Sequence, residues 1–246
     1  MQTQRVLPAM ARIRPSFNES GDLVIIVPGY VEIIIRKNSS CLGRTSTVSV
    51  WNSVCEAIDQ GDEVAEILVK FLGKEGLRLV RMSDDFVRYV EKGYVRQDDL
   101  HQVGFADQYS FLLSNHCSLE FLREKCGISS LHMHRFRPNI VLHGDSLHAF
   151  DEDEWSKVQI GKTKFEIAKM CSRCQVPRID PWTGEMNANN EPTKTLRKFR
   201  LFGSQVMFGQ NAVALNFGAD VTVGDSLFVI SRKRPSNSPA HGKGIA

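Results

Sequence analysis

Short runs of β-branched and aromatic residues, each ended by glycine, proline or a polar turn, dominate this 246-residue sequence. Such runs predict β-strands, because branched side chains pack well on a pleated sheet and the turn residues end each strand. Helical spacing of apolar residues is confined to a few segments, namely "DEVAEILVKFLG", "SLEFLREKCG" and "EPTKTLRKFR". The pattern therefore predicts a mainly β fold with peripheral helices, of the α+β class.

Composition excludes several classes of protein. The formal net charge is +3, and the tail "SRKRPSNSPAHGKGIA" holds four basic residues without an acid, so the rest of the chain is near neutral. A near-neutral body argues against nucleic-acid binding. No apolar run approaches the roughly 20 residues of a membrane-spanning helix, and the first residues lack the apolar stretch of a signal peptide. We expect an intracellular protein whose tail, rich in proline, glycine and serine, is disordered.

Two cysteines three residues apart, Cys171 and Cys174, lie in "IAKMCSRCQVPRIDPWTGE". This spacing alone fits part of a zinc site, a dithiol redox pair or two inert cysteines. Structural zinc usually needs a second close pair of ligands, and the other cysteines and the histidines are scattered. A redox pair should open a helix, whereas two prolines and a turn follow here. Arg173 favours a neighbouring thiolate, so we interpret the loop as functional, with free thiols and a soft ligand for a cofactor-held metal.

The segment "RFRPN" is a candidate anion site. Arg135 and Arg137 alternate in a predicted strand, so we expect both side chains on one face. A guanidinium can hold a phosphate through two parallel hydrogen bonds, although a surface salt bridge explains the same residues. Asn139 offers both a donor and an acceptor.

Two other short motifs give weaker indications of a functional site. The run "DEDEW" predicts a solvated acidic turn, as exposed acidic runs usually do. The segment "IGKT" lacks the first glycine of a phosphate-binding loop, because Ser156 occupies that position, so no nucleotide site is expected there.

Several longer segments, in the same order along the chain, resemble MOSC domain proteins. The nearest branch contains the mitochondrial amidoxime reducing component and the C-terminal region of molybdenum cofactor sulfurase. The segments are "FADQYSFLLSNHCSLEFL", "RFRPNIVLHG", "FDEDEW", "IGKTKFEIAKMCSRCQVPRIDPWTGE", "EPTKTLRKFR" and "FGQNAVALNFGADVTVGDSLFV". The resemblance implies a MOSC-type β-barrel in residues 95–232, preceded by a partial N-terminal β-barrel region in residues 1–94, with a disordered basic tail in residues 233–246.

The resemblance also implies a molybdenum cofactor and the residues that hold it. The metal would be bound by a pterin dithiolene and by one cysteine, which by position is Cys174, the catalytic residue. Ser172 and Arg173 would contact the pterin side, and Arg137 and Asn139 the polar end and phosphate. Asp107 and Gln108 would line the cofactor from another loop.

The implied activity is reduction of small N-hydroxylated compounds such as amidoximes. Electrons would come from a b-type cytochrome and its NADH reductase, because the chain shows no iron–sulfur cysteine set and no flavin fingerprint. A cofactor-binding or carrier module without turnover is the alternative, as is an inactive shortened isoform, since the Lys-Ser pair and Gly-Asp-Arg segment of relatives do not occur here. The family also implies pyridoxal phosphate binding and the mitochondrial outer membrane, with a cytoplasmic location left open.

Overall fold

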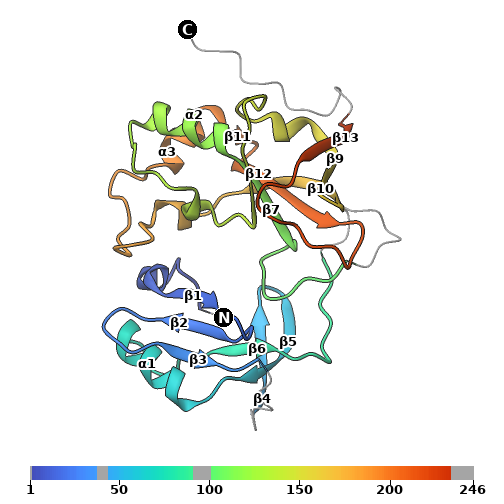
Figure 1. Cartoon of the computed structure of the whole chain (residues 1–246). Coiled ribbons are helices and arrows are strands. Elements are labelled where there is room, and N and C mark those ends of the chain that lie inside the picture. The colour runs from blue at the N-terminus through green and yellow to red at the C-terminus, as the bar shows by residue number, and fades with distance from the viewer. Residues whose placement is uncertain (1, 38–43, 91–100, 234–246) are drawn as a thin grey trace. The chain divides into compact units, whose positions relative to one another are not determined.

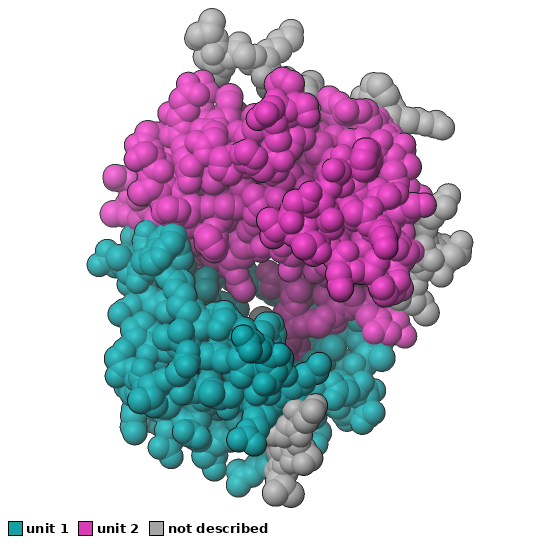
Figure 2. Space-filling model, in the orientation of Figure 1, with its two compact units in different colours: residues 1–88, 179–186 teal, residues 89–178, 187–246 magenta. Residues whose placement is uncertain are grey.

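The computed structural model describes residues 2–37, 44–90 and 101–233 (Figure 1). The chain forms two compact units, coloured separately in Figure 2. Unit 1 comprises residues 1–88 and 179–186, and unit 2 comprises residues 89–178 and 187–246. The expected domain boundary at residue 94 lies outside the described residues. The fold is mainly β with a few peripheral helices, as predicted.

Unit 1 contains two three-stranded antiparallel sheets, a 3-10 helix and an α-helix. The elements are η1 (Pro8–Arg12), β1 (Arg14–Phe17), β2 (Leu23–Ile26), β3 (Ile33–Ile35), β4 (Thr45–Val50), β5 (Ser53–Asp59), α1 (Asp62–Leu72) and β6 (Val80–Met82). The predicted polar turn joins β1 to β2, where the Asp22 amide donates to Asn18 Oδ1 at 2.8 Å. The apolar face of α1 packs its Val64 and Leu68 against Ile25, Val27 and Ile33.

The ends of α1 follow from its sequence. Asp62 and Glu63 in the first turn favour the positive end of the helix dipole. Gly73 ends the helix in the left-handed conformation (φ 63°), which glycine adopts without a Cβ penalty. The predicted helix is therefore confirmed.

A short segment from later in the chain, residues 179–186, belongs to unit 1. Ile179 and Met186 form an isolated antiparallel bridge. Arg14 Nη2 donates to the Pro181 carbonyl at 2.7 Å, and the Arg14 guanidinium lies over the Trp182 ring at 5.7 Å. Nothing in the local pattern of these residues predicts this long-range contact.

Unit 2 is built on one sheet with the strand order β13-β9-β10-β12-β7-β8. All these neighbours pair antiparallel except β7 and β8, which are parallel. The described pairings run from β13 to β8 without closing, which gives half a barrel. The strands are β7 (Phe111–Asn115), β8 (Ile140–Leu142), β9 (Trp155–Ile160), β10 (Thr163–Ser172), β12 (Gln205–Ala214) and β13 (Leu227–Arg232), with β11 (Leu201–Phe202) paired to β12.

Two apolar clusters stabilise unit 2. One lies on the sheet around Trp155, Phe165 and Leu113. The other joins the helices to β12 and includes Leu119, Leu122 and Phe208. The helices are α2 (His116–Cys126), α3 (Thr193–Phe199), and the 3-10 helices η2 (Met133–Phe136), η3 (Asp151–Glu154) and η4 (Val176–Arg178). Asn115 caps α2 by accepting from the Cys117 amide at 2.9 Å.

The predicted strand through "RFRPN" is wrong. Arg135 lies in the 3-10 helix η2, and Arg137 adopts a left-handed conformation at its end (φ 56°). The alternation expected to place both arginines on one face is therefore absent. Pro138 explains the difference, because it has no amide hydrogen and cannot donate to a strand ladder. Regular pairing begins only at Ile140 in β8.

The predicted solvated turn at "DEDEW" is also wrong. Glu152 is 1% exposed and accepts hydrogen bonds from Ser118 Oγ at 3.0 Å and Asn115 Nδ2 at 3.1 Å. Asp153 pairs with Arg200 Nη1 at 2.6 Å. These partners come from distant parts of the chain, so the local acidic pattern did not reveal them.

The first residue of the predicted tail, Lys233, is tied to unit 2. Its amide donates to the Glu154 carbonyl at 2.7 Å, and its Nζ donates to the Asp153 carbonyl at 3.0 Å. The rest of the predicted disordered tail, residues 234–246, lies outside the described residues. No helix in the described part of the chain has both the length and the apolar character needed to span a membrane.

Candidate functional site

The two cysteines of the "CSRC" segment have different surroundings. Cys171 lies within β10 and is half-buried, whereas Cys174 lies just beyond the strand and is exposed. The Arg173 amide donates to the Val206 carbonyl at 2.7 Å, which ties the end of β10 to β12. The Val176 amide donates to Cys174 Sγ at 3.5 Å and helps to orient the sulfur. Both cysteines are free thiols, as predicted.

The Arg173 guanidinium points into unit 2. Nε and Nη2 donate to the Phe208 carbonyl at 2.9 and 2.6 Å, and Nη1 donates to the Phe136 carbonyl at 2.9 Å. Burial lowers the pKa of Arg173, and the nearby thiols of Cys171 and Cys174 oppose that effect. The side chain therefore joins the cysteine loop to β12 and to the segment that precedes Arg137, and its predicted contact with a pterin stays a prediction.

Cys171 is held by its neighbours rather than presented to solvent. Burial raises the pKa of its thiol, and the charge of Asp107 raises it further. Arg173 and a hydrogen bond with the Asn211 side chain act in the opposite direction. The structure thus brings Asp107, Arg173 and both cysteines close together. The sequence reasoning missed Asn211, although it lies in the quoted segment "FGQNAVALNF".

Gly209 allows β12 to pass closely beside β7, next to the Arg173 side chain. It has a positive φ of 73°, and a Cβ there would lie 2.7 Å from Ser114 Oγ and 2.8 Å from the Leu113 carbonyl oxygen. The same Cβ would approach Arg173 Nη2 at 3.4 Å. Only glycine fits this position without displacing its neighbours. Ser114 Oγ is buried without a hydrogen-bond partner among the described residues. Neither feature was found from the sequence.

Arg137 is exposed and its backbone is strained. A left-handed conformation costs a non-glycine residue about 1–2 kcal/mol, and such outliers cluster at functional sites. Among the residues that the structure describes, the Arg137 guanidinium makes no hydrogen bond or ion pair. A strained backbone that holds an unpaired cation at the surface is well suited to bind an anion.

Asn139 holds its segment against β7, a role that the sequence did not predict. Its amide donates to the Leu112 carbonyl at 3.0 Å, and its Oδ1 accepts from the Leu112 amide at 2.9 Å. These bonds fix the segment that carries Arg137 to β7. Its Nδ2 group is the part of the side chain left for a ligand.

The remaining predicted residues lie in exposed positions. Ser172 is the last residue of β10. Asp107 and Gln108 lie together on the loop before β7, where the next residue, Tyr109, is buried against Val103 and Val213. That buried ring anchors the loop from which Asp107 influences Cys171.

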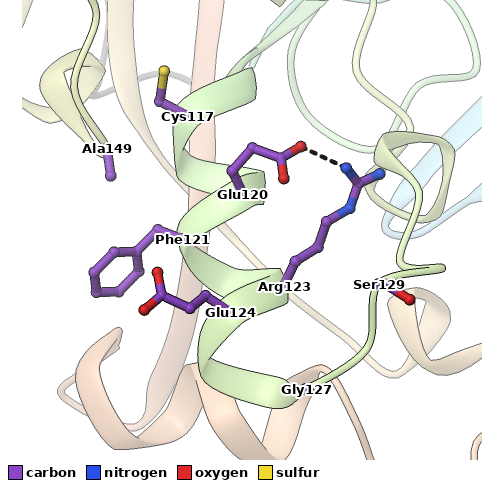
Figure 3. A pocket seen from close by; sticks show the side chains of 8 residues that line it. All are labelled: Cys117, Glu120, Phe121, Arg123, Glu124, Gly127, Ser129 and Ala149. Carbon is purple, nitrogen blue, oxygen red and sulfur yellow. Dashed lines mark hydrogen bonds and ion pairs between the residues drawn. The ribbon is translucent and has the colours of Figure 1, made fainter.

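A surface pocket elsewhere on unit 2 contains none of the predicted residues. Its volume is about 870 Å³, and Figure 3 shows its lining side chains, most of them from α2. Glu120 and Arg123 form an ion pair at 2.5 Å. The lining residues are Cys117, Glu120, Phe121, Arg123, Glu124, Gly127, Ser129 and Ala149. No group of three or more His, Cys, Asp or Glu residues in the described chain could hold a metal ion, so a zinc site finds no support there.

The residues around the cysteine loop fit an anionic cofactor with a soft metal. Cys174 offers a single accessible sulfur, which suits a metal held mainly by other ligands. Arg137 and Arg173 supply positive charge from segments joined through the Phe136 carbonyl. A phosphorylated group with one soft metal centre would need such an accessible sulfur and nearby positive charge, and it would not need a cluster of protein ligands.

Comparisons with known proteins identify the family of the chain. The model of the MOSC domain matches residues 100–228, and that of the MOSC N-terminal beta barrel domain matches residues 1–75. Molybdenum cofactor sulfurase 1 of Aedes aegypti is 31% identical over 222 residues, which cover 84% of this chain and 27% of that protein. Mitochondrial amidoxime-reducing component 1 of Homo sapiens is 27% identical over 244 residues, covering 94% and 70%.

Mitochondrial amidoxime reducing component 2 of Bos taurus is 27% identical over 202 residues, covering 82% of this chain and 59% of that protein. The chain spans about a quarter of the length of the sulfurases that it matches. The MOSC domain match alone includes more than half of the chain, and it contains the cysteine loop, Arg137 and Asn139. By these matches and by its half-barrel fold, the chain belongs to the MOSC domain family.

Proposed function

We propose that this chain binds a molybdenum cofactor and reduces N-hydroxylated compounds such as amidoximes. The observation that carries the proposal is the exposed, free thiol of Cys174 at the end of β10, beside the buried guanidinium of Arg173. When bound, the cofactor would supply the two-electron chemistry that breaks the N–O bond. Reduction of an amidoxime consumes two electrons and two protons and yields an amidine and water.

The protein residues would bind and orient the cofactor. Cys174 would provide the sulfur ligand to the metal, and Arg137 would hold the phosphate, with Asn139 fixing that segment to β7. Ser172 and Arg173 would border the pterin, and Asp107 and Gln108 would line the opposite loop. Cys171 would not bind the metal, because it is half-buried and its thiol is hydrogen-bonded to the Asn211 side chain.

Electrons would come from a partner protein. The family resemblance implies a b-type cytochrome with its NADH reductase as the donor, and the names of two relatives, amidoxime-reducing components, fit a reductive role. A mitochondrial location belongs to the same proposal, with a cytoplasmic location as its alternative. Pyridoxal phosphate binding stays a prediction from the family resemblance, since no residue described above was assigned to it.

A cofactor-binding module without turnover is the second candidate. The identity with molybdenum cofactor sulfurases reaches 31%, compared with 27% for the human and bovine amidoxime-reducing components. In that case the same residues would bind the cofactor for transfer or modification rather than for substrate reduction. Binding of the cofactor therefore does not by itself distinguish the two functions.

The test uses protein expressed in a host that makes the cofactor. Molybdenum content per chain is measured first, followed by benzamidoxime reduction with NADH, a b-type cytochrome and its reductase. The reductase function predicts molybdenum near one per chain and NADH oxidation matched to benzamidine formation. Bound molybdenum without turnover identifies the binding module, and absence of both contradicts the proposal.

A further inference from the structure

The strand β13 forms one end of the unit 2 sheet and presents apolar side chains to solvent. Phe228 is 62% exposed and Ile230 is 49% exposed, whereas the alternate residues Leu227 and Val229 pack against the sheet core. β13 pairs with β9 on one side. On its other side, no strand of the described chain pairs with it. Exposed apolar edge strands are templates for pairing with another chain.

The backbone direction shows which groups of β13 are available at this edge. The Ser226 carbonyl accepts from the Gly161 amide at 3.2 Å, so Ser226 faces β9. Consecutive residues of an antiparallel strand direct their polar groups to opposite sides. Leu227 and Val229 therefore direct their N–H and C=O groups toward the outer edge. The register shifts of β13 begin only after Val229, which leaves residues 227–229 regular.

We infer that β13 is a self-association surface, which pairs antiparallel with β13 of a second copy of this chain. A two-fold axis at Phe228 sets each Phe228 opposite that of the other copy. Leu227 then lies opposite the partner's Val229, so the outward polar groups of both residues form hydrogen bonds. Ser226 lies opposite the partner's Ile230. The same patch thus serves both copies, as a two-fold interface requires.

The charges at the ends of the strand match this arrangement. Asp225 precedes the strand and Arg232 ends it, and both are exposed. In the antiparallel register each Arg232 approaches the partner's Asp225. Arg232 also pairs with Glu154 of its own copy at 2.9 Å, so the basic end is already bordered by an acid. Asp225 and Arg232 are thus complementary in charge between two copies related by this axis, which favours a second copy as the partner.

The loop between β12 and β13 also carries exposed apolar side chains. Phe217 and Val223 are exposed in this loop, and Asn216 ties it to the β9–β10 turn by accepting from the Lys164 amide at 2.7 Å. Aromatic side chains at the centre of an interface contribute a large share of its affinity. Phe228 is the central residue of the proposed interface and is the side chain to change.

The first test measures the oligomeric state of the full chain by sedimentation velocity and light scattering over a range of protein concentrations. We expect a reversible dimer whose dissociation constant rises by at least about tenfold in Phe228→Lys. Phe17→Lys is the matched control, because Phe17 is 76% exposed on β1 of unit 1. A parent that stays monomeric up to several hundred micromolar, or equal effects of the two substitutions, overturns the proposal.

The second test probes the register. Directly opposed residues that do not exchange backbone hydrogen bonds have Cβ atoms about 4.5–5.5 Å apart, which is close to the range of a disulfide. Phe228→Cys should therefore give a covalent dimer with oxidised glutathione, above the level seen for the parent and for Phe17→Cys. Equal cross-linking of the two variants contradicts the register. Binding of a monomeric parent to anionic vesicles, lost in Phe228→Lys, would assign the surface to lipid instead.

Discussion

The Arg78 ion pairs of unit 1 lie partly in solvent, whereas the Arg200–Asp153 pair of unit 2 is buried. In unit 1, Arg78 pairs with Asp59 and Asp62 at 2.6 Å, and the side chains are 35%, 12% and 76% exposed. In unit 2, Arg200 pairs with Asp153 at 2.6 Å, and their side chains are only 4% and 14% exposed. Water solvates the first group of charges in part and is nearly excluded from the second. Loss of the arginine should therefore affect stability differently in the two units, although both ion pairs join arginine to aspartate.

The buried acids Glu152 and Asp153 of unit 2 have several hydrogen-bonding partners. Asp153 also accepts from Gln210 Nε2 at 2.6 Å, and Arg200 lies over the Phe150 ring at 4.3 Å. Glu152 is bonded to Ser118 and Asn115. A buried charge is tolerated only when such partners replace water. The groups link η3, α2 and α3 to β12, which also carries the carbonyl that holds Arg173. The polar interior thus supports the strand beneath the candidate site.

The largest expected effect comes from breaking the buried ion pair. Arg200→Met should lower the free energy of unfolding by about 3–5 kcal/mol, because Asp153 then stays buried without its cation. Chemical denaturation of the purified parent and variant measures the difference. If Asp153→Asn, combined with Arg200→Met, is no more stable than Arg200→Met alone, an uncompensated charge is not the cause. If Arg200→Met lowers the free energy of unfolding by no more than the loss of an exposed ion pair does, the two units do not differ in this respect.

Glu152 gives the next largest effect, and it depends on pH. Burial raises the pKa of Glu152 to about 7, from an ordinary value of 4.5. Below pH 4.5 the carboxyl is protonated in both the folded and the unfolded chain. As the pH rises from 4.5 through 7, the unfolded chain releases this proton first, so the folded state loses relative stability. The loss should approach about 3 kcal/mol above pH 7.

The measurement compares the parent with Glu152→Gln, which keeps a polar group but cannot ionise. Unfolding free energies of the two proteins should differ little at pH 4 and should diverge toward pH 8, with the variant more stable. Other groups titrate equally in both proteins and cancel in the difference. A constant difference across this pH range would show that Glu152 ionises normally in the folded state.

The smallest effect is expected for the surface pair in unit 1. Arg78→Met leaves Asp62 in contact with water, and Asp59, whose side chain is 12% exposed, keeps the Gly61 amide as a hydrogen-bond donor, so the substitution should change the free energy of unfolding less than Arg200→Met does. The small change should also shrink in high salt, because ions screen exposed charges. A salt-independent loss as large as that of Arg200→Met would show that the two units do not differ in this respect.

Local sequence patterns predicted the elements that are stabilised by residues close to them in the sequence. The helix α1 has acidic residues at its start and Gly73 at its end, and the turn at Asn18–Asp22 closes through its own side chain. The cap of α2 is likewise local, because Asn115 accepts from the amide of Cys117, two residues further along the chain. In the site, the order of the conspicuous motifs identified the family and the loop that holds Cys174. The exposed position of that cysteine agrees with the prediction of a loop at the end of a strand.

Features that depend on distant partners were missed. Glu152 and Asp153 are buried because Ser118, Asn115 and Arg200 reach them from elsewhere in the chain. Arg137 leaves the expected strand because Pro138 cannot donate to a ladder. Arg173 points inward because two backbone carbonyls lie within reach, which no local pattern records. Asn211 and Gly209 were missed because their roles arise only when β12 lies beside β10.

The most direct test of the account is the molybdenum content of two serine variants, measured per folded chain after expression in a host that makes the cofactor. Cys174→Ser should lose the metal, because a neutral alcohol replaces a soft sulfur ligand, while its free energy of unfolding stays within about 0.5 kcal/mol of the parent, as for other exposed sites. Cys171→Ser should keep the metal and lose about 1–3 kcal/mol of stability at its half-buried position. Retention of molybdenum by Cys174→Ser and its loss from Cys171→Ser would contradict the assignment.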